Sequence, residues 1–178
     1  MSEKTIKTST RPDWTEYFML IVDAVSTRGT CPRGQCGSII TRDNVLLSTG
    51  YVGAPSGSPQ CDEIGCLIKE VKHEDGHVSA HCKRTVHAEA NAILQAAKNG
   101  MSIKGGTIFT RMMPCIDCAM LIVNSGLKKV VAKKDYHESA AGKEIFKNAG
   151  VEIEIINPEV ETYAGGQQIK PKDIKKTK

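Results

Sequence analysis

The chain has 178 residues, of which 40% are hydrophobic and only 4% aromatic, and its formal net charge is +4. This length predicts one domain with a core that is filled mainly by aliphatic side chains. The charge does not indicate a nucleic-acid-binding surface, because residues 169–178 carry five Lys and one Asp and so account for all of it.

The first half of the chain predicts a helix, a β-hairpin and an irregular insert. Apolar residues recur at helical spacing over 14–25, after a Pro-Asp pair that suits a helix start. Residues 36–51 contain two apolar runs around a turn at 42–44, which is typical of a hairpin. Residues 53–83 show no clear period, yet an unstructured loop of this length is unusual in a compact domain, so something must organise it.

The second half alternates between helices and strands. The expected elements are a helix at 87–100, a strand at 106–112, a helix at 114–126, a strand at 128–134, a helix at 139–150 and a strand at 151–156. Strands joined through helices favour parallel pairing, whereas a hairpin adds an antiparallel edge. The predicted fold class is therefore α/β, a three-layer α/β/α sandwich around a five-stranded mixed sheet.

The same pattern predicts the domain organisation. We expect one domain at 12–156 with a Cys-rich insert at 53–85, a flexible N-terminus at 1–11, and a C-terminal tail at 157–178 that is basic and disordered at its end. No apolar run approaches the roughly 18 residues of a membrane span, and the N-terminus lacks a signal-peptide pattern. We therefore expect a cytoplasmic protein that contacts neither membrane nor nucleic acid, with seven reduced Cys.

Two cysteines open the helix expected at 114–126. Cys115 and Cys118 are three residues apart, so both thiols can face one point near a helix N-terminus, which favours thiolates. This spacing alone is also typical of a redox pair or of half a structural zinc site. His87 opens the preceding helix, and successive helices of a layered α/β fold begin at the same edge of the sheet. We expect the three side chains to converge on zinc and to leave its fourth position open for water, as catalytic sites do.

Glu89 follows His87 by two residues, so the two side chains point apart on a helix and Glu89 is a poor fourth ligand. Beside the open position it can instead take a proton from water and pass it to a substrate. The combination H-x-E…P-C-x-x-C, present here as His87-Ala88-Glu89 and Pro114-Cys115-Ile116-Asp117-Cys118, is the signature of zinc nucleobase deaminases. A capping Glu beside a chance Cys pair is the structural alternative.

With these motifs the sequence resembles the cytidine deaminase superfamily, and more closely the deoxycytidylate (dCMP) deaminases. The similar blocks, in the family's order, are WTEYFM, STGYVGAPSG, CKRTVHAEANAI, MPCIDCAMLIVNSGLKKVV and DYHE, which cover about residues 12–156. The resemblance implies hydrolytic deamination of dCMP to dUMP, which feeds thymidylate synthesis. It also implies zinc at His87, Cys115 and Cys118, with Glu89 as the proton shuttle.

The resemblance further implies that Tyr136 lies against the substrate and that Ala88 helps to hold the pyrimidine edge. One position departs from the family, since its usual Asn in G-Y-N-G is Val52 here, and Val52 cannot donate or accept a hydrogen bond with its side chain. Asn44 and Asn91 are candidate substitutes for that contact, although a turn and a helix face explain them equally well.

Many members of the family are activated by dCTP and inhibited by dTTP, and such a triphosphate would bring Mg²⁺. The resemblance places this regulation near Gly53, Pro55 and Gly57, with Arg33 assisting at phosphate, although an ordinary turn-rich loop is the alternative. Members of the family also typically form hexamers, so we expect a homo-oligomer.

The remaining cysteines suggest a second metal site. Cys61 and Cys66, followed by His81-Cys82, have the composition of ligands, and a structural zinc would tie the insert to the first helix. Our preferred ligands are Cys31, Cys61, Cys66 and Cys82, with His81 as the replacement; free thiols are the alternative.

Two other functions remain open. The first is a deaminase of another substrate, such as dCTP, free cytosine, a pteridine-type ring or tRNA adenosine, although a neutral folded part argues against tRNA. The second is a catalytically silent, zinc-stabilised interaction protein, which the presence of Glu89 argues against.

Overall fold

The computed structural model describes residues 11–72, 76 and 78–161. Five strands form one mixed sheet in the order β2-β1-β5-β6-β7. Their bounds are β1 Gly37–Arg42, β2 Val45–Tyr51, β5 Thr107–Met112, β6 Lys129–Tyr136 and β7 Glu152–Glu161. Strand β1 pairs antiparallel with β2 and β5, whereas β5, β6 and β7 run parallel. The predicted mixed five-stranded sheet is therefore confirmed, including its antiparallel edge.

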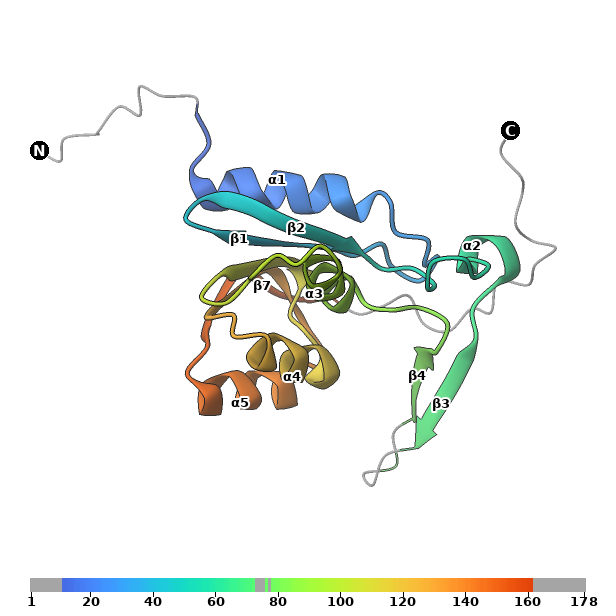
Figure 1. Ribbon diagram of the computed structural model, residues 1–178. Coiled ribbons are helices and arrows are strands. Elements are labelled where there is room, and N and C mark those ends of the chain that lie inside the picture. The colour runs from blue at the N-terminus through green and yellow to red at the C-terminus, as the bar shows by residue number, and fades with distance from the viewer. Residues whose placement is uncertain (1–10, 73–75, 77, 162–178) are drawn as a thin grey trace, which may run out of the picture.

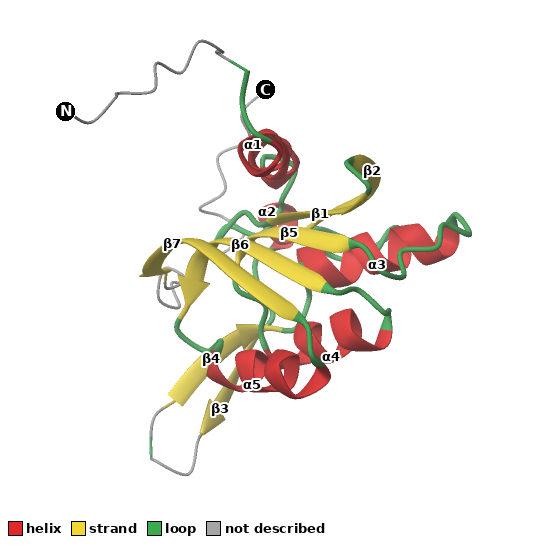
Figure 2. Ribbon diagram, turned by 90° about the vertical axis from the view of Figure 1, so that its left-hand side faces the viewer, coloured by secondary structure: helices red, strands yellow, loops and turns green. Residues whose placement is uncertain are grey.

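Four helices complete the three layers. They are α1 Trp14–Ser26, α3 Ala88–Lys98, α4 Ile116–Asn124 and α5 Ala140–Ala149. Helix α1 covers one face of the sheet, and α3, α4 and α5 cover the other (Figure 2). Alternate residues of one strand serve the two cores, because Ile39 packs with Phe18 beneath α1 while Ile40 belongs to the cluster that contains Phe146 of α5.

The hairpin turns where the sequence predicts. Asp43 and Asn44 both have positive φ, 52° and 60°, the conformation that a two-residue hairpin turn of right-handed twist requires. Strand β7 continues to Glu161, beyond the end expected at 156, because an edge strand tolerates Pro158, whose missing N–H costs no ladder hydrogen bond there. The expected flexible segment at 1–10 and the tail from 162 onward lie outside the described residues.

The insert is more regular than we expected. It contains a single helical turn, α2 Cys61–Ile64, and a separate two-stranded sheet of β3 Ile68–Lys72 and β4 Val78–Cys82 that projects from the main body (Figure 1). The sequence hides these strands because most of their residues remain partly or fully exposed, so no alternation of apolar and polar residues marks them.

The starts of α3 and α4 and the end of β6 lie at one edge of the sheet. Strands β2, β5 and β6 point the same way, since β1 is antiparallel to β2 and β5, and β6 is parallel to β5. The chain enters α4 directly after β5, and α3 packs against β2 and begins near its end. The helix starts therefore meet the end of β6 at the carboxyl edge of the strands, where open α/β sheets place their sites.

Candidate active site and metal centres

Three metal-binding side chains converge at this edge. His87 is the N-cap of α3 and Cys115 is the N-cap of α4, while Cys118 lies in the first turn of α4. His87 Nδ1 is 3.5 Å from the Sγ atoms of both Cys115 and Cys118. The ligand atoms of all three lie within 4.8 Å of one another. The helix at 114–126 begins two residues later than expected, so Pro114 precedes the helix and Cys115 caps it.

The chemistry of these donors fits zinc. One imidazole nitrogen and two thiols form a His-Cys-Cys set with room for a fourth group. Hydrogen bonds from Cys118 and His87 lower the pKa of Cys115 to about 4, and the hydrogen bond with Cys115 raises the pKa of His87 to about 9. The protein thus favours the thiolate of Cys115, whereas the hydrogen bond with Cys115 and burial raise the pKa of Cys118, so the protons on Cys118 and on the imidazole must leave when zinc binds.

Glu89 lies beside the three ligands without joining them. The residue is only 8% exposed, and Oε2 is 3.6 Å from Cys118 Sγ. Thr110 Oγ1 donates to Glu89 Oε1 over 3.1 Å, and Ser38 Oγ in turn donates to Thr110 over 2.9 Å. Burial is the main cause that raises the pKa of Glu89. One carboxylate oxygen is therefore fixed by a buried hydroxyl chain, while the other faces the metal centre.

Sequence reasoning missed Ser38 and Thr110. They are paired across β1 and β5, and both are fully buried. The available signal was a hydroxyl residue in the middle of each of two apolar strands, since a buried hydroxyl needs a hydrogen-bond partner.

A cleft opens over the metal centre. Its lining residues are Cys36, Val52, His87, Ala88, Glu89, Met112, Met113, Cys115 and Tyr136. Ala88, Val52 and Tyr136, which the sequence assigned to the substrate, are brought together here, and each is at most 8% exposed. Val52 is held in place because its N–H donates to the carbonyl of Cys36 over 2.9 Å. Cys36 is buried and also reaches the cleft.

The two Asn candidates lie elsewhere. Asn44 occupies the hairpin turn, at the end of β1 and β2 that is remote from Val52, so its assignment to the substrate was wrong. Asn91 instead donates through Nδ2 to the carbonyl of Tyr51 over 2.7 Å, which ties α3 to β2.

The glycine-rich loop is organised by a residue that the sequence did not highlight. Gln60 Oε1 accepts hydrogen bonds from the N–H of Ala54 and the hydroxyl of Thr30, at 2.9 and 2.8 Å. Gly53 is buried and forms an isolated bridge with Val86, whereas Gly57 is exposed with φ 83°. This loop is therefore fixed at its base near the cleft and open at its tip.

Pro55 and Arg33 complete the residues that the resemblance linked to effectors. Pro55 is exposed on the open part of the loop, where its carbonyl accepts from the N–H of Ser58 over 3.0 Å. Arg33 lies in the connection before β1, and its buried Nε has no hydrogen-bond partner among the described residues.

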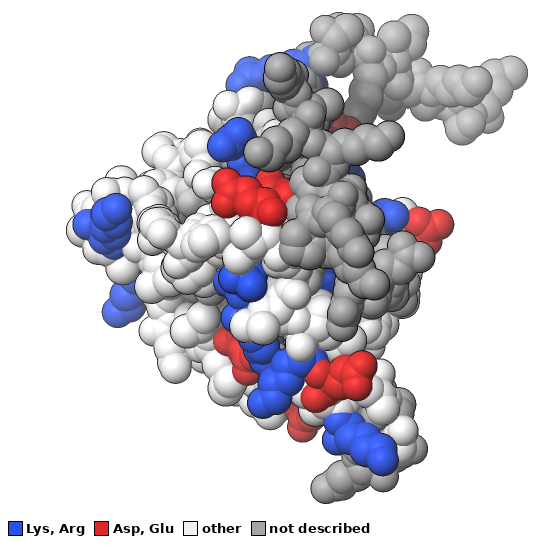
Figure 3. Space-filling model, turned by 90° about the vertical axis from the view of Figure 1, so that its right-hand side faces the viewer, with Lys and Arg blue, Asp and Glu red and all other residues white. Residues whose placement is uncertain are grey.

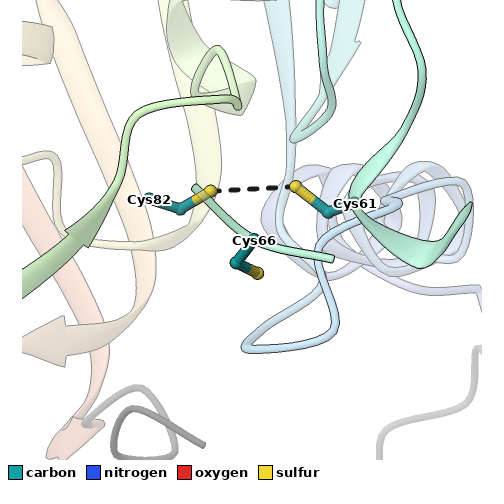
Figure 4. A group of neighbouring side chains, drawn as sticks. All are labelled: Cys61, Cys66 and Cys82. Carbon is teal, nitrogen blue, oxygen red and sulfur yellow. Dashed lines mark hydrogen bonds between the residues drawn. The ribbon is translucent and has the colours of Figure 1, made fainter. Parts of the chain in front are cut away.

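A second group of side chains that could hold a metal ion lies in the insert. The thiols of Cys61 and Cys82 point toward one another, with Cys66 beside them (Figure 4), and the three sulfur atoms lie within 4.8 Å of one another. The Sγ atoms of Cys61 and Cys82 are 3.7 Å apart. Burial is the main cause that raises the pKa of Cys66 to about 11, with Cys82 and Cys31 adding to it.

Among the described residues, no fourth ligand atom joins this group. Cys31 is buried nearby, where it contributes to the raised pKa of Cys61 and Cys66, but its sulfur lies outside the group of three. The choice of His81 as the replacement was wrong. His81 precedes Cys82 on a strand and so points to the opposite face, where its Nε2 is 2.8 Å from Ser79 Oγ.

Charge on the surface is mixed. On the face shown in Figure 3, basic and acidic groups of the described residues are interspersed and form no continuous basic band. The described helices include none that is both long and apolar enough to cross a membrane.

Comparison with known proteins agrees with this site. Residues 12–134 match the model of the cytidine and deoxycytidylate deaminase zinc-binding region. ComE operon protein 2 of Bacillus subtilis (strain 168) is 38% identical over 144 residues, which span 81% of this chain and 71% of that protein. Deoxycytidylate deaminase of Enterobacteria phage T2 is 35% identical over 159 residues, which span 72% of this chain and 85% of that protein.

A solved structure extends the agreement to the fold. The dCMP deaminase of cyanophage S-TIM5 in complex with dCMP and dUMP superposes with a TM-score of 0.66 at 29% identity, covering 83% of this chain and 99% of that one. The family match, the relatives and the converging His-Cys-Cys set with its adjacent Glu89 lead to one assignment. The chain belongs to the cytidine and deoxycytidylate deaminase family and carries that family's zinc-binding region.

Proposed function

We propose that the chain catalyses the hydrolytic deamination of dCMP to dUMP and ammonia. The observation that carries the proposal is Glu89, a buried carboxylate that Thr110 fixes through one oxygen while the other faces His87, Cys115 and Cys118. Burying an ionisable carboxylate next to an open metal position costs stability, and a protein that only binds a partner would gain nothing in return. A catalytic role accounts for the burial. Relatives named deoxycytidylate deaminase point to the same substrate.

The metal ligands, Glu89 and Thr110 have separate roles in this reaction. Zinc, when His87, Cys115 and Cys118 hold it, supplies a Lewis acid that makes water acidic near neutral pH. Glu89 Oε2 takes a proton from the water that attacks C4 of the cytosine ring and delivers protons to the ring and to the departing amino group. The new bond joins the water oxygen to C4, the bond from C4 to the amino nitrogen breaks, and ammonia leaves. Thr110 keeps the carboxylate in one orientation throughout.

The rest of the cleft holds the base. Tyr136 offers an aromatic ring and Ala88 a small buried surface at the start of α3, so a flat pyrimidine can lie between them. Val52 presents only methyl groups to the cleft, so the hydrogen bond that Asn supplies at this position in the family is missing. This observation favours one second candidate, a deaminase with the same chemistry and a different nucleotide preference, such as dCTP.

We also propose a structural zinc at Cys61, Cys66 and Cys82, with Cys31 as the fourth ligand. The three sulfur atoms already lie within 4.8 Å of one another, and Cys31 is buried beside them in the connection that follows α1. Closing the site would join three separate segments, which explains how so short a helix as α2 and an isolated hairpin keep their places. Metal analysis of the purified protein should give two zinc ions per chain; a value of one removes this site.

The proposal also covers the oligomeric state, the compartment and regulation by nucleotides. We expect a cytoplasmic hexamer that dCTP with Mg²⁺ activates and dTTP inhibits, through the loop of Gly53, Pro55 and Gly57 with Arg33 nearby. The open tip of the loop and the unpaired Nε of Arg33 suit a phosphate ligand. Mass measurement in solution tests the hexamer.

The deciding experiment is an assay of the zinc-loaded protein on dCMP, CMP, dCTP and deoxycytidine, each with and without dCTP or dTTP as effector. We expect turnover of dCMP, and loss of at least about 1,000-fold in kcat for Glu89→Gln with zinc content unchanged. Glu144→Gln, an exposed carboxylate of α5, is the matched control and should leave kcat unaltered. A fully active Glu89→Gln enzyme would disprove the mechanism. Turnover of another nucleotide but not of dCMP would keep the mechanism and show that the substrate is that nucleotide.

A further inference from the structure

Glu138 connects three side chains next to the cleft, and the chemistry described above does not use it. Tyr136 donates its phenol hydrogen to Glu138 Oε2 over 3.0 Å. His81 Nε2 lies 3.8 Å from the same oxygen, and His137 Nε2 lies 3.6 Å from Oε1. The side chain of Glu138 is 27% exposed, so water screens these contacts only in part.

The backbone of Tyr136 is held independently of Glu138. Asp135 Oδ1 accepts from the N–H of Tyr136 and from Ser139 Oγ, both at 2.8 Å, while Lys143 donates to Oδ2 at 2.6 Å. Asp135 therefore fixes where the residue sits, while the phenol is directed at Glu138. Because the Tyr136 ring lines the cleft with His87 and Glu89, that direction shapes the wall against which a base would lie.

His81 brings the insert into this arrangement. Cys82 points toward Cys61 and Cys66, and His81, one residue earlier on β4, points to the opposite face. Ser79 Oγ lies 2.8 Å from His81 Nε2, and the same nitrogen lies 3.8 Å from Glu138 Oε2. Glu138 is thus a point where the β3–β4 hairpin contacts the turn that follows Tyr136 at the end of β6.

We propose that Glu138 is a positioning residue that fixes the phenol of Tyr136 and couples it, through His81, to the β3–β4 hairpin. The hairpin then supports the substrate side of the cleft without touching the substrate. This inference rests on the proposed function for its kinetic consequence, but not for the contact itself.

Kinetics with dCMP test the role in binding. Glu138→Ala should raise KM about three- to tenfold, the order expected when one hydrogen bond that orients a binding group is lost, and leave kcat within about twofold. Tyr136→Phe removes the same hydrogen bond from the other side, so the double variant should be no worse than the poorer single variant. Glu138→Gln keeps an acceptor oxygen and should recover most of the loss, while Glu144→Gln serves as the surface control. Additive losses in the double variant would overturn the proposal.

A second readout is independent of turnover. In zinc-loaded protein with ¹³C-labelled tyrosine rings, the Cζ resonance that Tyr136→Phe removes identifies Tyr136. Glu138→Ala should shift that resonance, and His81→Ala should shift it by a smaller amount, with zinc content unchanged. An unmoved resonance in Glu138→Ala would refute the positioning role, and an unmoved resonance in His81→Ala would refute the link to the hairpin. If the wild-type protein left dCMP unchanged while these shifts occurred, the proposed function alone would fail.

Discussion

Gly50 is the position where a single methyl group should do the most damage to catalysis without touching a functional side chain. A Cβ atom there would lie 2.2 Å from the backbone nitrogen of Ala92 and 2.3 Å from the carbonyl oxygen of Ala88. Both are main-chain atoms of α3, so neither can rotate away. Ordinary contacts of a Cβ begin at 3.4 Å, so α3 would have to move away from β2 by about 1 Å or β2 would have to bend.

That movement reaches the site directly, because Ala88 lies between His87 and Glu89 at the start of the same helix. Overpacking of this kind costs about 1–3 kcal/mol of stability and occasionally more. A displacement of about 1 Å in catalytic geometry can cost on the order of 100-fold in rate. For Gly50→Ala we therefore expect the free energy of unfolding to fall by about 2–3 kcal/mol and kcat for dCMP to fall by about 10- to 100-fold.

The matched control is Gly100→Ala, just beyond the other end of α3. Gly100 has φ 65° and nothing within 4 Å of an added Cβ, so the substitution costs backbone strain of about 1 kcal/mol without a clash. It should lower stability and leave kcat unchanged. Denaturant unfolding and steady-state kinetics on both variants, with zinc content measured, separate the two effects. Gly50→Ala with kcat within twofold of the wild type would refute the reasoning.

Three further perturbations test separate parts of the site. Thr110→Val removes the hydroxyl that fixes Glu89, so kcat should fall about tenfold with zinc content unchanged; an unchanged kcat would show that the bond does not orient the carboxylate. Val52→Asn restores a hydrogen-bonding group in the cleft and should lower KM for dCMP about three- to tenfold, which competition binding with dUMP can check. Burial alone would raise the pKa of Asp135, but hydrogen bonds, that from Lys143 foremost, outweigh it and lower the pKa. Its contribution to stability is therefore complete above the unfolded pKa of about 3.9 and is lost as the pH falls through the lower folded value. Urea unfolding should show Asp135→Asn less stable than the wild type by a constant amount from pH 5 to 8, with the gap closing only below about pH 4.

The convergence of His87, Cys115 and Cys118 was predictable from sequence because each is positioned by local structure. His87 and Cys115 are N-caps, and Cys118 lies one turn further on, so knowing where two helices start was enough to bring the three together. The same reasoning failed for Asn44, because Asn44 lies at the turn of the β1–β2 hairpin, whereas Val52 and the cleft lie at its open end. For His81 the strand period would have excluded it as a partner of Cys82, had the strand been recognised.

What the sequence could not supply are contacts between distant segments. Thr110 supports Glu89 from a different strand, and Gln60 organises the glycine-rich loop from beyond its end. Glu138 meets His81 across more than fifty positions of the chain. None of these pairs has a spacing rule, because their proximity is created only when the sheet and the insert are assembled.

The position of each residue in the fold predicts whether its substitution changes kcat or KM. The residues that perform the chemistry stand on helix starts that pack against the sheet, as the close approach of α3 to Gly50 shows. The residues that face the base, Val52 and Tyr136, stand at strand ends that loops and the insert support. Changes to the first group should therefore act mainly on kcat, and changes to the second mainly on KM. This separation explains how a member of the family can carry Val52 in place of Asn, because the substitution alters the wall of the cleft while leaving the metal ligands and Glu89 where they are.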